Sequence, residues 1–214
     1  MHSNHVMDPL YVSTPRDTGT FALPHEPGVT LYYELRGNST SATKVVLLMG
    51  SLATTRHVDE LADRLVAATG GELLSFDWRG IGRSTASERT RLRSQTSREL
   101  ALDAHALLSH TWGAGESSGD IDVHVYGASM GGMVAQRLAL LLLHAQKSSR
   151  LQLRSLTLAV TASCYGLARF MPLPACFYRF MLPLALPSDP GTMVASLLPK
   201  VFAPEYLNSR HPRT

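Results

Sequence analysis

Four short apolar runs restrict what this sequence can fold into more than any other feature. They are KVVLLMG, ELLSFD, IDVHVYG and RSLTLAVTA, and they begin at residues 44, 72, 121 and 154. Unbroken apolar runs of this length are typical of strands that are buried on both faces of a parallel sheet. A further strand is predicted at residues 29–36, where the sequence reads VTLYYELR.

Segments with helical periodicity separate these runs. Apolar side chains recur at helical spacing over residues 58–66 and again over residues 100–108. Residues 129–145 are apolar almost all round, which predicts a buried helix. Residues 84–97 are polar and rich in arginine, and we expect a solvated loop there rather than a phosphate site. The alternation predicts an α/β fold, a mostly parallel sheet with helices on both faces.

The composition excludes several classes of protein. Of 214 residues, 44% are hydrophobic and 17% are charged, which excludes a mainly disordered, collagen-like or coiled-coil chain. The net charge of +3, from 20 basic and 17 acidic residues, is too small and too mixed to predict a nucleic-acid partner. Cys164 and Cys176 form neither a disulfide framework nor a metal-type cluster, and we expect them in a reducing compartment.

The sequence predicts neither a targeting segment nor a membrane-spanning segment. The N-terminus, MHSNHVMDPLYVSTPRDTG, lacks an apolar signal-peptide core and carries Asp8 and Asp17. The sequence has no stretch of about 18 or more uninterrupted apolar residues, so no membrane-spanning helix is predicted. With the cysteine content, these observations predict a cytoplasmic protein.

The segment GASMGG, residues 127–132, joins the third apolar run to the apolar helix and fits the pattern G-x-S-x-G. A nucleophilic serine needs a sharp strand-to-helix turn that exposes its hydroxyl, with little side-chain bulk two residues to either side. The turn also puts Ser129 at a helix N-terminus, where free backbone N–H groups favour developing negative charge. The pattern predicts a nucleophile elbow with Ser129 as the nucleophile. The alternative is a tight turn that carries an idle serine.

With this turn, two further segments make the sequence resemble the α/β-hydrolase family, of the serine esterase and lipase type, over about residues 28–165. VVLLMGS, FDWRGIGRS and YGASMGGMVAQ occur in the family's order and at sensible spacing. The second segment matches a pattern of the family that is expected to be structural: Asp77, Arg79, Gly80, Gly82 and Ser84. The resemblance implies hydrolysis of a carboxylic ester or other acyl bond through an acyl-serine intermediate. Serine at the elbow argues against the dehalogenase and epoxide-hydrolase branches, which need a carboxylate nucleophile.

The resemblance also implies an oxyanion hole made by backbone N–H groups. Met49 stands where the family often has a histidine, while Gly50 is kept. Ser51 falls at the position whose N–H completes the hole, and the N–H of Met130 is the other expected donor. A backbone donor tolerates side-chain change, so the hole can survive the loss of the histidine. The resemblance implies no metal and no organic cofactor.

The family's catalytic acid and histidine base are not identifiable, so no complete triad can be assigned. His144 and His211 follow the elbow in sequence. His144 lies about four turns along the same helix, too far from the serine to act as its base, and His211 lies in a terminus that is expected to be frayed. His124 is expected to be a hydrogen-bonded core residue, and His57 either flanks a helix or lines the site. Asp189 falls in a Pro-Ser-Asp-Pro turn and is expected to be structural.

Three regions are predicted along the chain. Residues 1–18 are a flexible tail, residues 19–162 are the α/β-hydrolase core, and residues 163–214 are the start of a lid or cap region. The sequence offers no candidates for the family's last two strands, so we expect a fold that is truncated before them.

The segment GLARFMPLPACFYRFMLPLALP, residues 166–187, has three interpretations. It is a lid suited to a small lipophilic ester or acyl substrate, or it is core that would pack against missing residues. The third is weak peripheral membrane contact, with Arg169 and Arg179 near lipid headgroups. The sequence carries no signal for an oligomeric state.

Three functional hypotheses follow. The chain is a truncated form of an active serine hydrolase, or a catalytically inactive hydrolase-like protein with a binding or regulatory role, or a chain that works with another subunit. A sheet that is cut short exposes an edge strand and an apolar face, which is a known aggregation liability. That cost favours the truncated enzyme over an independently evolved binding module.

Overall fold

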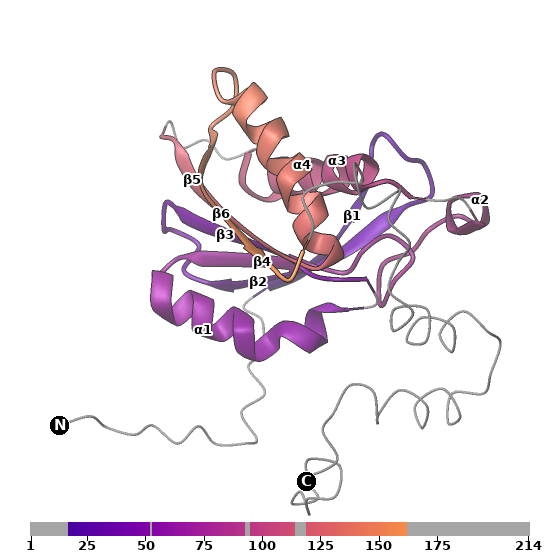
Figure 1. The fold of residues 1–214 in the computed structure, drawn as a ribbon, viewed down its shortest axis with the longest axis horizontal. Helices are drawn as coiled ribbons and strands as arrows, with labels where there is room; N and C mark the ends of the chain where they lie inside the picture. The colour runs from indigo at the N-terminus through magenta and orange to yellow at the C-terminus, as the bar shows by residue number, and fades with distance from the viewer. Residues whose placement is uncertain (1–16, 52, 93–94, 114–118, 162–214) are drawn as a thin grey trace, which may run out of the picture. The chain divides into compact units, whose positions relative to one another are not determined.

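The computed structural model describes residues 17–51, 53–92, 95–113 and 119–161. These residues form a six-stranded sheet in the order β1-β2-β4-β3-β5-β6 (Figure 1). The strands are β1 (Asp17–Ala22), β2 (Thr30–Gly37), β3 (Thr43–Leu48), β4 (Glu72–Phe76), β5 (Ile121–Ala128) and β6 (Leu151–Ala159). Strands β4, β3, β5 and β6 are parallel neighbours, whereas β2 is antiparallel to both β4 and β1. The predicted mostly parallel α/β sheet is confirmed.

Helices cover both faces of this sheet, as predicted. The helices are η1 (Thr55–Val58), α1 (Asp59–Thr69), α2 (Glu88–Leu92), α3 (Ser97–Leu108), η2 (Ser109–Gly113) and α4 (Met130–Ala145). In Figure 1, α1 lies on one face, and α3 and α4 lie side by side on the other. The prediction of a loop over residues 84–97 is wrong where the short helix α2 forms.

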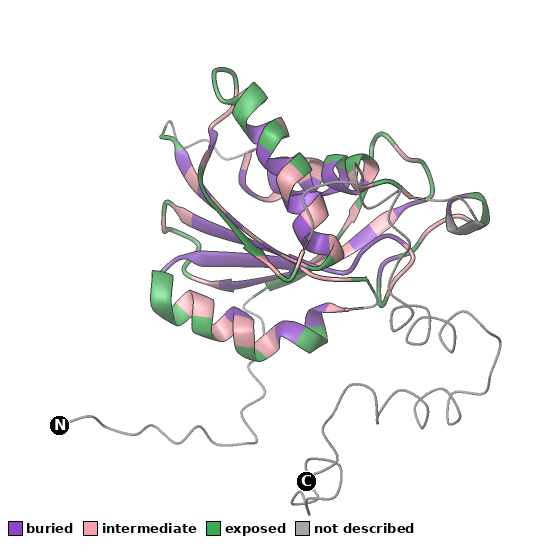
Figure 2. Ribbon diagram, viewed as in Figure 1, coloured by how far each residue is buried: buried purple, intermediate pink, exposed green. Residues whose placement is uncertain are grey.

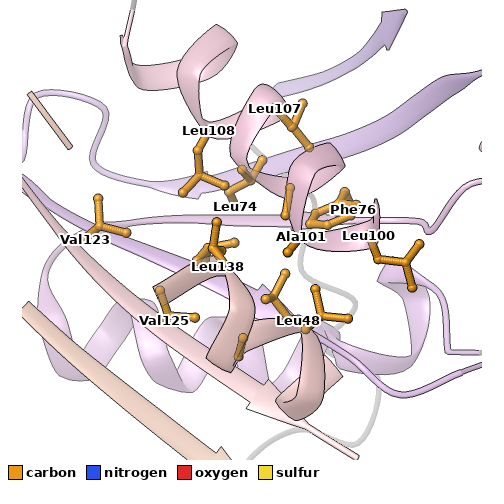
Figure 3. Packing of buried hydrophobic residues seen from close by; sticks show 14 of the residues in the cluster. Leu48, Leu74, Phe76, Leu100, Ala101, Leu107, Leu108, Val123, Val125 and Leu138 are labelled. Atoms are coloured by element: carbon orange, nitrogen blue, oxygen red, sulfur yellow. The ribbon is translucent and has the colours of Figure 1, made fainter. Parts of the chain in front are cut away.

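The apolar runs divide their side chains between two layers of core, because consecutive residues of a strand point to opposite faces. In β3, Val46 and Leu48 join the larger cluster beneath α3 and α4, whereas Val45 and Leu47 join the smaller cluster beneath α1. Figure 3 shows the larger cluster, in which Leu48 lies among side chains of α3, α4, β4 and β5. The runs are therefore apolar throughout because both faces of the central strands are buried.

The first strand was not predicted from the sequence. β1 begins at Asp17, within the stretch that was expected to be a tail, and pairs with β2 from Asp17 opposite Leu35 to Ala22 opposite Thr30. Its sequence, DTGTFA, contains one large apolar residue and carries little strand signal of its own. We therefore attribute the formation of this strand to its pairing with β2 rather than to its own strand propensity.

The helix α4 is less buried than its composition predicts. Val134, Leu138 and Leu142 are buried against the sheet, but Leu140 and Leu143 are 47% and 50% exposed. Figure 2 shows exposed positions along the outer side of this helix. The prediction that the helix is buried all round is wrong on this outer face.

The strand β6 is also less buried than its apolar sequence indicates. It lies at the edge of the described sheet, and only its first two residues, Leu151 and Gln152, are buried. Leu156 and Leu158 are 38% and 43% exposed, and Val160, just after the strand, is 95% exposed. Figure 2 shows this part of the strand in green, the colour of exposed residues. Its apolar sequence is typical of a strand covered on both faces, but the exposure of its carboxyl half agrees with the expectation that a sheet cut short exposes an edge strand and an apolar face.

Candidate active site

The sheet reverses its strand order at β3, and this is where the sequence motifs meet. Along the chain, β4 lies on one side of β3, and β5 and β6 lie on the other. In open α/β sheets, ligands bind outside the carboxyl ends of the strands at such a point. The parallel strands β3, β4 and β5 end beside one another and lead directly into Met49, Asp77 and Ser129. The three segments that carry the resemblance therefore reach the same edge of the sheet.

Ser129 lies in a sharp turn between β5 and α4. Its backbone has φ 54° and ψ −123°, a conformation that costs a residue with a side chain about 1–3 kcal/mol. The Ser129 N–H donates to the Ala159 carbonyl at 3.0 Å, and the Ser129 carbonyl accepts from the Gly132 N–H at 3.0 Å and the Thr161 hydroxyl at 2.7 Å. The residue is exposed. The turn is thus strained, held by backbone contacts on two sides and open to solvent.

Close packing explains the glycines around this serine. A Cβ at Gly127 would lie 2.5 Å from the Cβ of Ala135, and a Cβ at Gly131 would overlap the carbonyl oxygen of Leu48. Real Cβ atoms do not approach other atoms this closely. The helix after the serine therefore packs directly on the backbone of β3, and the spacing G-x-S-x-G follows from that contact.

The β3–η1 loop, residues 49–54, approaches the serine from the neighbouring strand. A Cβ built at Gly50 would lie 3.3 Å from the Cβ of Ser129 and 3.6 Å from its Oγ. Ser51 is the next residue and is exposed. Met130 is the first residue of α4, so its N–H has no partner within the helix. The residues predicted to supply oxyanion donors thus flank Ser129 and its contact with Gly50, and their role stays a prediction.

The described histidines are engaged elsewhere or lie far from the serine. The ring Nδ1 of His57 accepts from the Thr54 N–H at 3.1 Å, so His57 caps the start of η1. The ring Nδ1 of His124 lies 2.8 Å from the hydroxyl of Ser155 across β5 and β6. The predicted hydrogen bond is present, but His124 is partly exposed rather than in the core. His144 is exposed, near the far end of α4.

The base and the acid of a triad are not found in the described part of the chain. Among residues 17–51, 53–92, 95–113 and 119–161, no histidine or carboxylate hydrogen-bonds the Ser129 hydroxyl. His211, Asp189 and residues 166–187 lie outside the described residues. The same is true of Cys164 and Cys176.

The loop after β4 is held by buried hydrogen bonds and by a buried ion pair. Nε of Arg79 donates to Oδ2 of Asp103 at 2.6 Å, and both side chains are 1% exposed. The Ser84 hydroxyl donates to the Asp77 carbonyl at 2.6 Å. These contacts agree with a structural role for the D-x-R-G-x-G-x-S segment. Asp103 was missed in the sequence analysis, although a lone acid on the apolar face of residues 100–108 was an available signal.

The part of the chain that the structure describes holds neither a candidate metal site nor a candidate membrane-spanning helix. No three His, Cys, Asp or Glu side chains in that part of the chain are grouped so that they could hold a metal ion. None of the helices described is both long enough and apolar enough to cross a bilayer.

Comparison with known proteins identifies the family. A family model described as serine aminopeptidase, S33, matches residues 39–188. The chain belongs to this family of α/β-hydrolases. A similar curated protein is the rhodomycin D methylesterase DnrP of Streptomyces peucetius, which is 35% identical over 112 residues, 52% of this chain and 35% of that protein.

Solved structures of other hydrolases agree with the fold. A hydrolase from Pseudomonas aeruginosa is similar with a TM-score of 0.63 and 25% identity, over 92% of this chain and 63% of that one. A probable hydrolytic enzyme from the same organism has a TM-score of 0.60 and 19% identity, over 89% of this chain and 57% of that one. The chain thus spans about a third of the length of the methylesterase and less than two thirds of each of these structures.

Proposed function

We propose that this chain carries the nucleophile and the oxyanion donors of a serine hydrolase that cleaves carboxylic esters or related acyl bonds. The observation that carries the proposal is the backbone of Ser129, which is strained at φ 54° and ψ −123° between β5 and α4. Residues held in strained backbone conformations cluster at active sites, where the strain can be part of the mechanism. The approach of Gly50 to the same residue adds a second backbone segment to the site.

The chemistry follows from these positions. The Ser129 hydroxyl loses its proton to a base as its oxygen attacks the carbonyl carbon of the ester. The carbonyl oxygen becomes negatively charged, and the N–H groups of Met130 and Ser51 donate hydrogen bonds to it. As this intermediate collapses, the protonated base gives its proton to the leaving oxygen, so the alcohol departs and an acyl-serine remains. Water then hydrolyses the acyl-serine to the carboxylic acid and free Ser129. The described residues supply the nucleophile and the donors, and the base and the acid come from elsewhere.

The proposed substrate is a carboxylic ester with a lipophilic part. The similarity to a protein named as a methylesterase supports an ester. The lipophilic part rests on the sequence of residues 166–187, which is rich in Phe, Met and Leu. No cofactor is part of this proposal.

A fluorophosphonate probe and p-nitrophenyl esters test the proposal. We expect the probe to label Ser129, and Ser129→Ala to abolish both labelling and ester cleavage. Ser148→Ala is a matched control, because Ser148 is exposed just beyond the opposite end of α4, and it should label like the wild type. We expect slower labelling than with a complete serine hydrolase, since no base contacts Ser129 within the described ranges. Labelling that persists in Ser129→Ala would contradict the proposal.

The second candidate is a catalytically inactive hydrolase-like protein that binds a ligand or regulates a partner. The absence of a base or acid beside Ser129, among the residues the structure describes, favours it. It predicts that a lipophilic ester binds equally well to the wild type and to Ser129→Ala, with no turnover by either. Thermal-shift titration beside the ester assay separates the two candidates.

A further inference from the structure

Two adjacent residues after β4 hold both ends of the β3–η1 loop. At one end, the indole Nε1–H of Trp78 donates to the Met49 carbonyl at 3.0 Å. At the other end, the N–H of Thr55, the first residue of η1, donates to Oδ1 of Asp77 at 2.7 Å. Because Asp77 and Trp78 directly follow β4, the loop is tied at both ends to the strand beside β3.

The Asp77 anchor is held on its other side as well. The Asp77 side chain is completely buried, and its second oxygen, Oδ2, accepts from the Arg83 N–H at 2.8 Å. Gly82 has φ +57°, and a Cβ there would overlap Oδ2 of Asp77. A buried carboxylate is stable when N–H groups satisfy its oxygens. The two backbone donors therefore fix the carboxylate, and the carboxylate in turn fixes the end of the loop.

The Thr55 side chain adds a second attachment at the same end. Its hydroxyl donates to Oε1 of Glu34 at 3.1 Å and accepts from a guanidinium nitrogen of Arg83 at 2.7 Å. Thr55 and Glu34 are 1% and 4% exposed. The end of the loop is thus bound to β2 as well as to the segment after β4.

The loop itself lies at the surface between these buried anchors. Ser51 is exposed, and Gly50 is the residue whose backbone approaches Ser129. The position of the Ser51 N–H relative to Ser129 therefore depends on where the ends of the loop are held. An oxyanion donor must be placed within a few tenths of an ångström to act on the transition state.

We propose that Trp78 and Asp77 are positioning residues that set the β3–η1 loop against Ser129. Trp78 holds the start of the loop through the Met49 carbonyl, and Asp77 holds its end through the Thr55 N–H. The inference rests on the proposed function for its chemical meaning. It adds to that function two side chains whose hydrogen bonds go to Met49, Thr55 and Arg83 rather than to Ser129.

Trp78→Phe is the decisive variant. It deletes the indole N–H and leaves an aromatic ring to pack against Phe76, whose ring centroid lies 4.8 Å from that of Trp78. Trp112→Phe is the matched control, since Trp112 is also buried and donates its indole N–H to Glu72 at 2.9 Å. Glu72 begins β4, so this contact lies at the opposite end of the strand. Asp77→Asn serves as a second variant, because an amide has one acceptor oxygen for two N–H donors.

Hydrogen exchange, measured by mass spectrometry on the full chain, reports directly how well the amides of the β3–η1 loop are protected. In Trp78→Phe, we expect exchange in peptides covering residues 49–55 to rise by at least threefold, with β3 and α4 unchanged. In Trp112→Phe, those peptides should exchange as in the wild type. Where Asp77→Asn folds, it should raise exchange at residues 53–55 more than at the start of the loop.

Ester turnover or fluorophosphonate labelling supplies the second readout. Removing one oxyanion donor outright typically costs about 100-fold or more in kcat, so a misplaced donor should cost about tenfold. We expect that loss in kcat for Trp78→Phe with KM unchanged, and no such loss for Trp112→Phe. Loop exchange that rises no more than in Trp112→Phe overturns the inference, and so does an unchanged kcat. A wild type with no Ser129-dependent chemistry overturns the proposed function instead, and the exchange result still decides whether the anchors hold the loop.

Discussion

The backbone N–H of Ser129 donates a 3.0 Å hydrogen bond to the carbonyl of Ala159, the last residue of the edge strand β6. Two residues later, the Thr161 hydroxyl donates to the Ser129 carbonyl at 2.7 Å. The strained turn is therefore held by an edge strand whose carboxyl half is largely exposed. Whatever stabilises the end of β6 should also stabilise the position of the proposed nucleophile.

Val160 lies between these two contacts and is itself strained. It is a β-branched residue with φ 48°, and its side chain is 95% exposed. A left-handed conformation costs a residue other than glycine about 1–2 kcal/mol. Val160→Gly should therefore be more stable than Val160→Ala, by up to about 1 kcal/mol after the greater flexibility of unfolded glycine is included. Both variants remove the exposed side chain, so equal stabilities in urea unfolding would contradict the strain.

Gly131→Ala should disrupt the elbow. The new methyl group would overlap the carbonyl oxygen of Leu48, and the backbone of a central strand cannot move away cheaply. We expect a loss of about 3 kcal/mol in the free energy of unfolding. Gly119→Ala is the control, because a Cβ there meets nothing within 4 Å. If the two variants unfold at the same urea concentration, the close packing of α4 on β3 is wrong.

Asp103→Asn should be as damaging, for an electrostatic reason. Arg79 is 1% exposed and pairs with Asp103 from two guanidinium nitrogens. Removing one charge of a buried pair costs about 3–5 kcal/mol, because the other charge stays buried. Glu60→Gln is the control, since Glu60 and its partner Arg64 are 70% and 62% exposed. That change should cost less than about 0.5 kcal/mol, and a similar loss for both would show that Arg79 finds other compensation.

Some features of the structure can be predicted from the local sequence, and others cannot. The turn at Ser129 was predictable because the strain has to be resolved within a few residues, by glycines that the sequence displays. The central strands were predictable because burial on both faces makes each one apolar throughout. The anchors at Trp78 and Thr55 left no such trace, since each is a hydrogen bond between segments far apart in the chain.

Two further differences between the sequence-based expectations and the structure, at β1 and β6, arise from the neighbours of each strand. The sequence of β1 has little strand character, and the strand forms because β2 offers an open edge for pairing. The apolar composition of β6 is typical of a buried strand, but burial depends on neighbours, and the carboxyl half of this edge strand is largely exposed. An apolar composition thus indicates which surface would be stabilised by burial, but it does not show whether other residues bury that surface.

His105 should make stability depend on pH below about pH 7. Its ring Nε2 is buried and has no hydrogen-bond partner among the described residues, and burial lowers the pKa of His105 below its usual value of 6.5. Above that value, the imidazole is neutral in both states and contributes no pH dependence. As the pH falls below it, the unfolded chain binds the proton first, so the free energy of unfolding decreases until the folded pKa is passed.

His105→Leu should flatten the stability profile in that window, because leucine has no proton to gain. The free energy of unfolding would be measured in urea at half-unit steps of pH. His144→Leu is the matched control, since His144 is exposed on the outer side of α4. A wild-type profile that matches the His105→Leu profile from pH 7 to pH 5 would mean that the ring is solvated in the folded chain.

The exposed half of β6 should make the isolated chain prone to aggregate. Leu156 and Leu158 lie 38% and 43% exposed on an edge strand, and free edges with apolar side chains template association. Each large apolar side chain left in water forgoes roughly 1.5–3 kcal/mol, while a whole domain has only about 5–15 kcal/mol of stability. We therefore expect poor expression, aggregation or a need for a partner, with strong binding of a dye that reports exposed apolar surface.

Leu156→Thr with Leu158→Thr should reduce both dye binding and aggregation, because threonine keeps strand propensity and removes apolar area. Leu102→Gln is the control: Leu102 is 37% exposed but lies on α3, away from the edge of the sheet. It should change neither readout by much. A purified wild-type monomer with a sharp, reversible thermal transition and little dye binding would contradict the prediction.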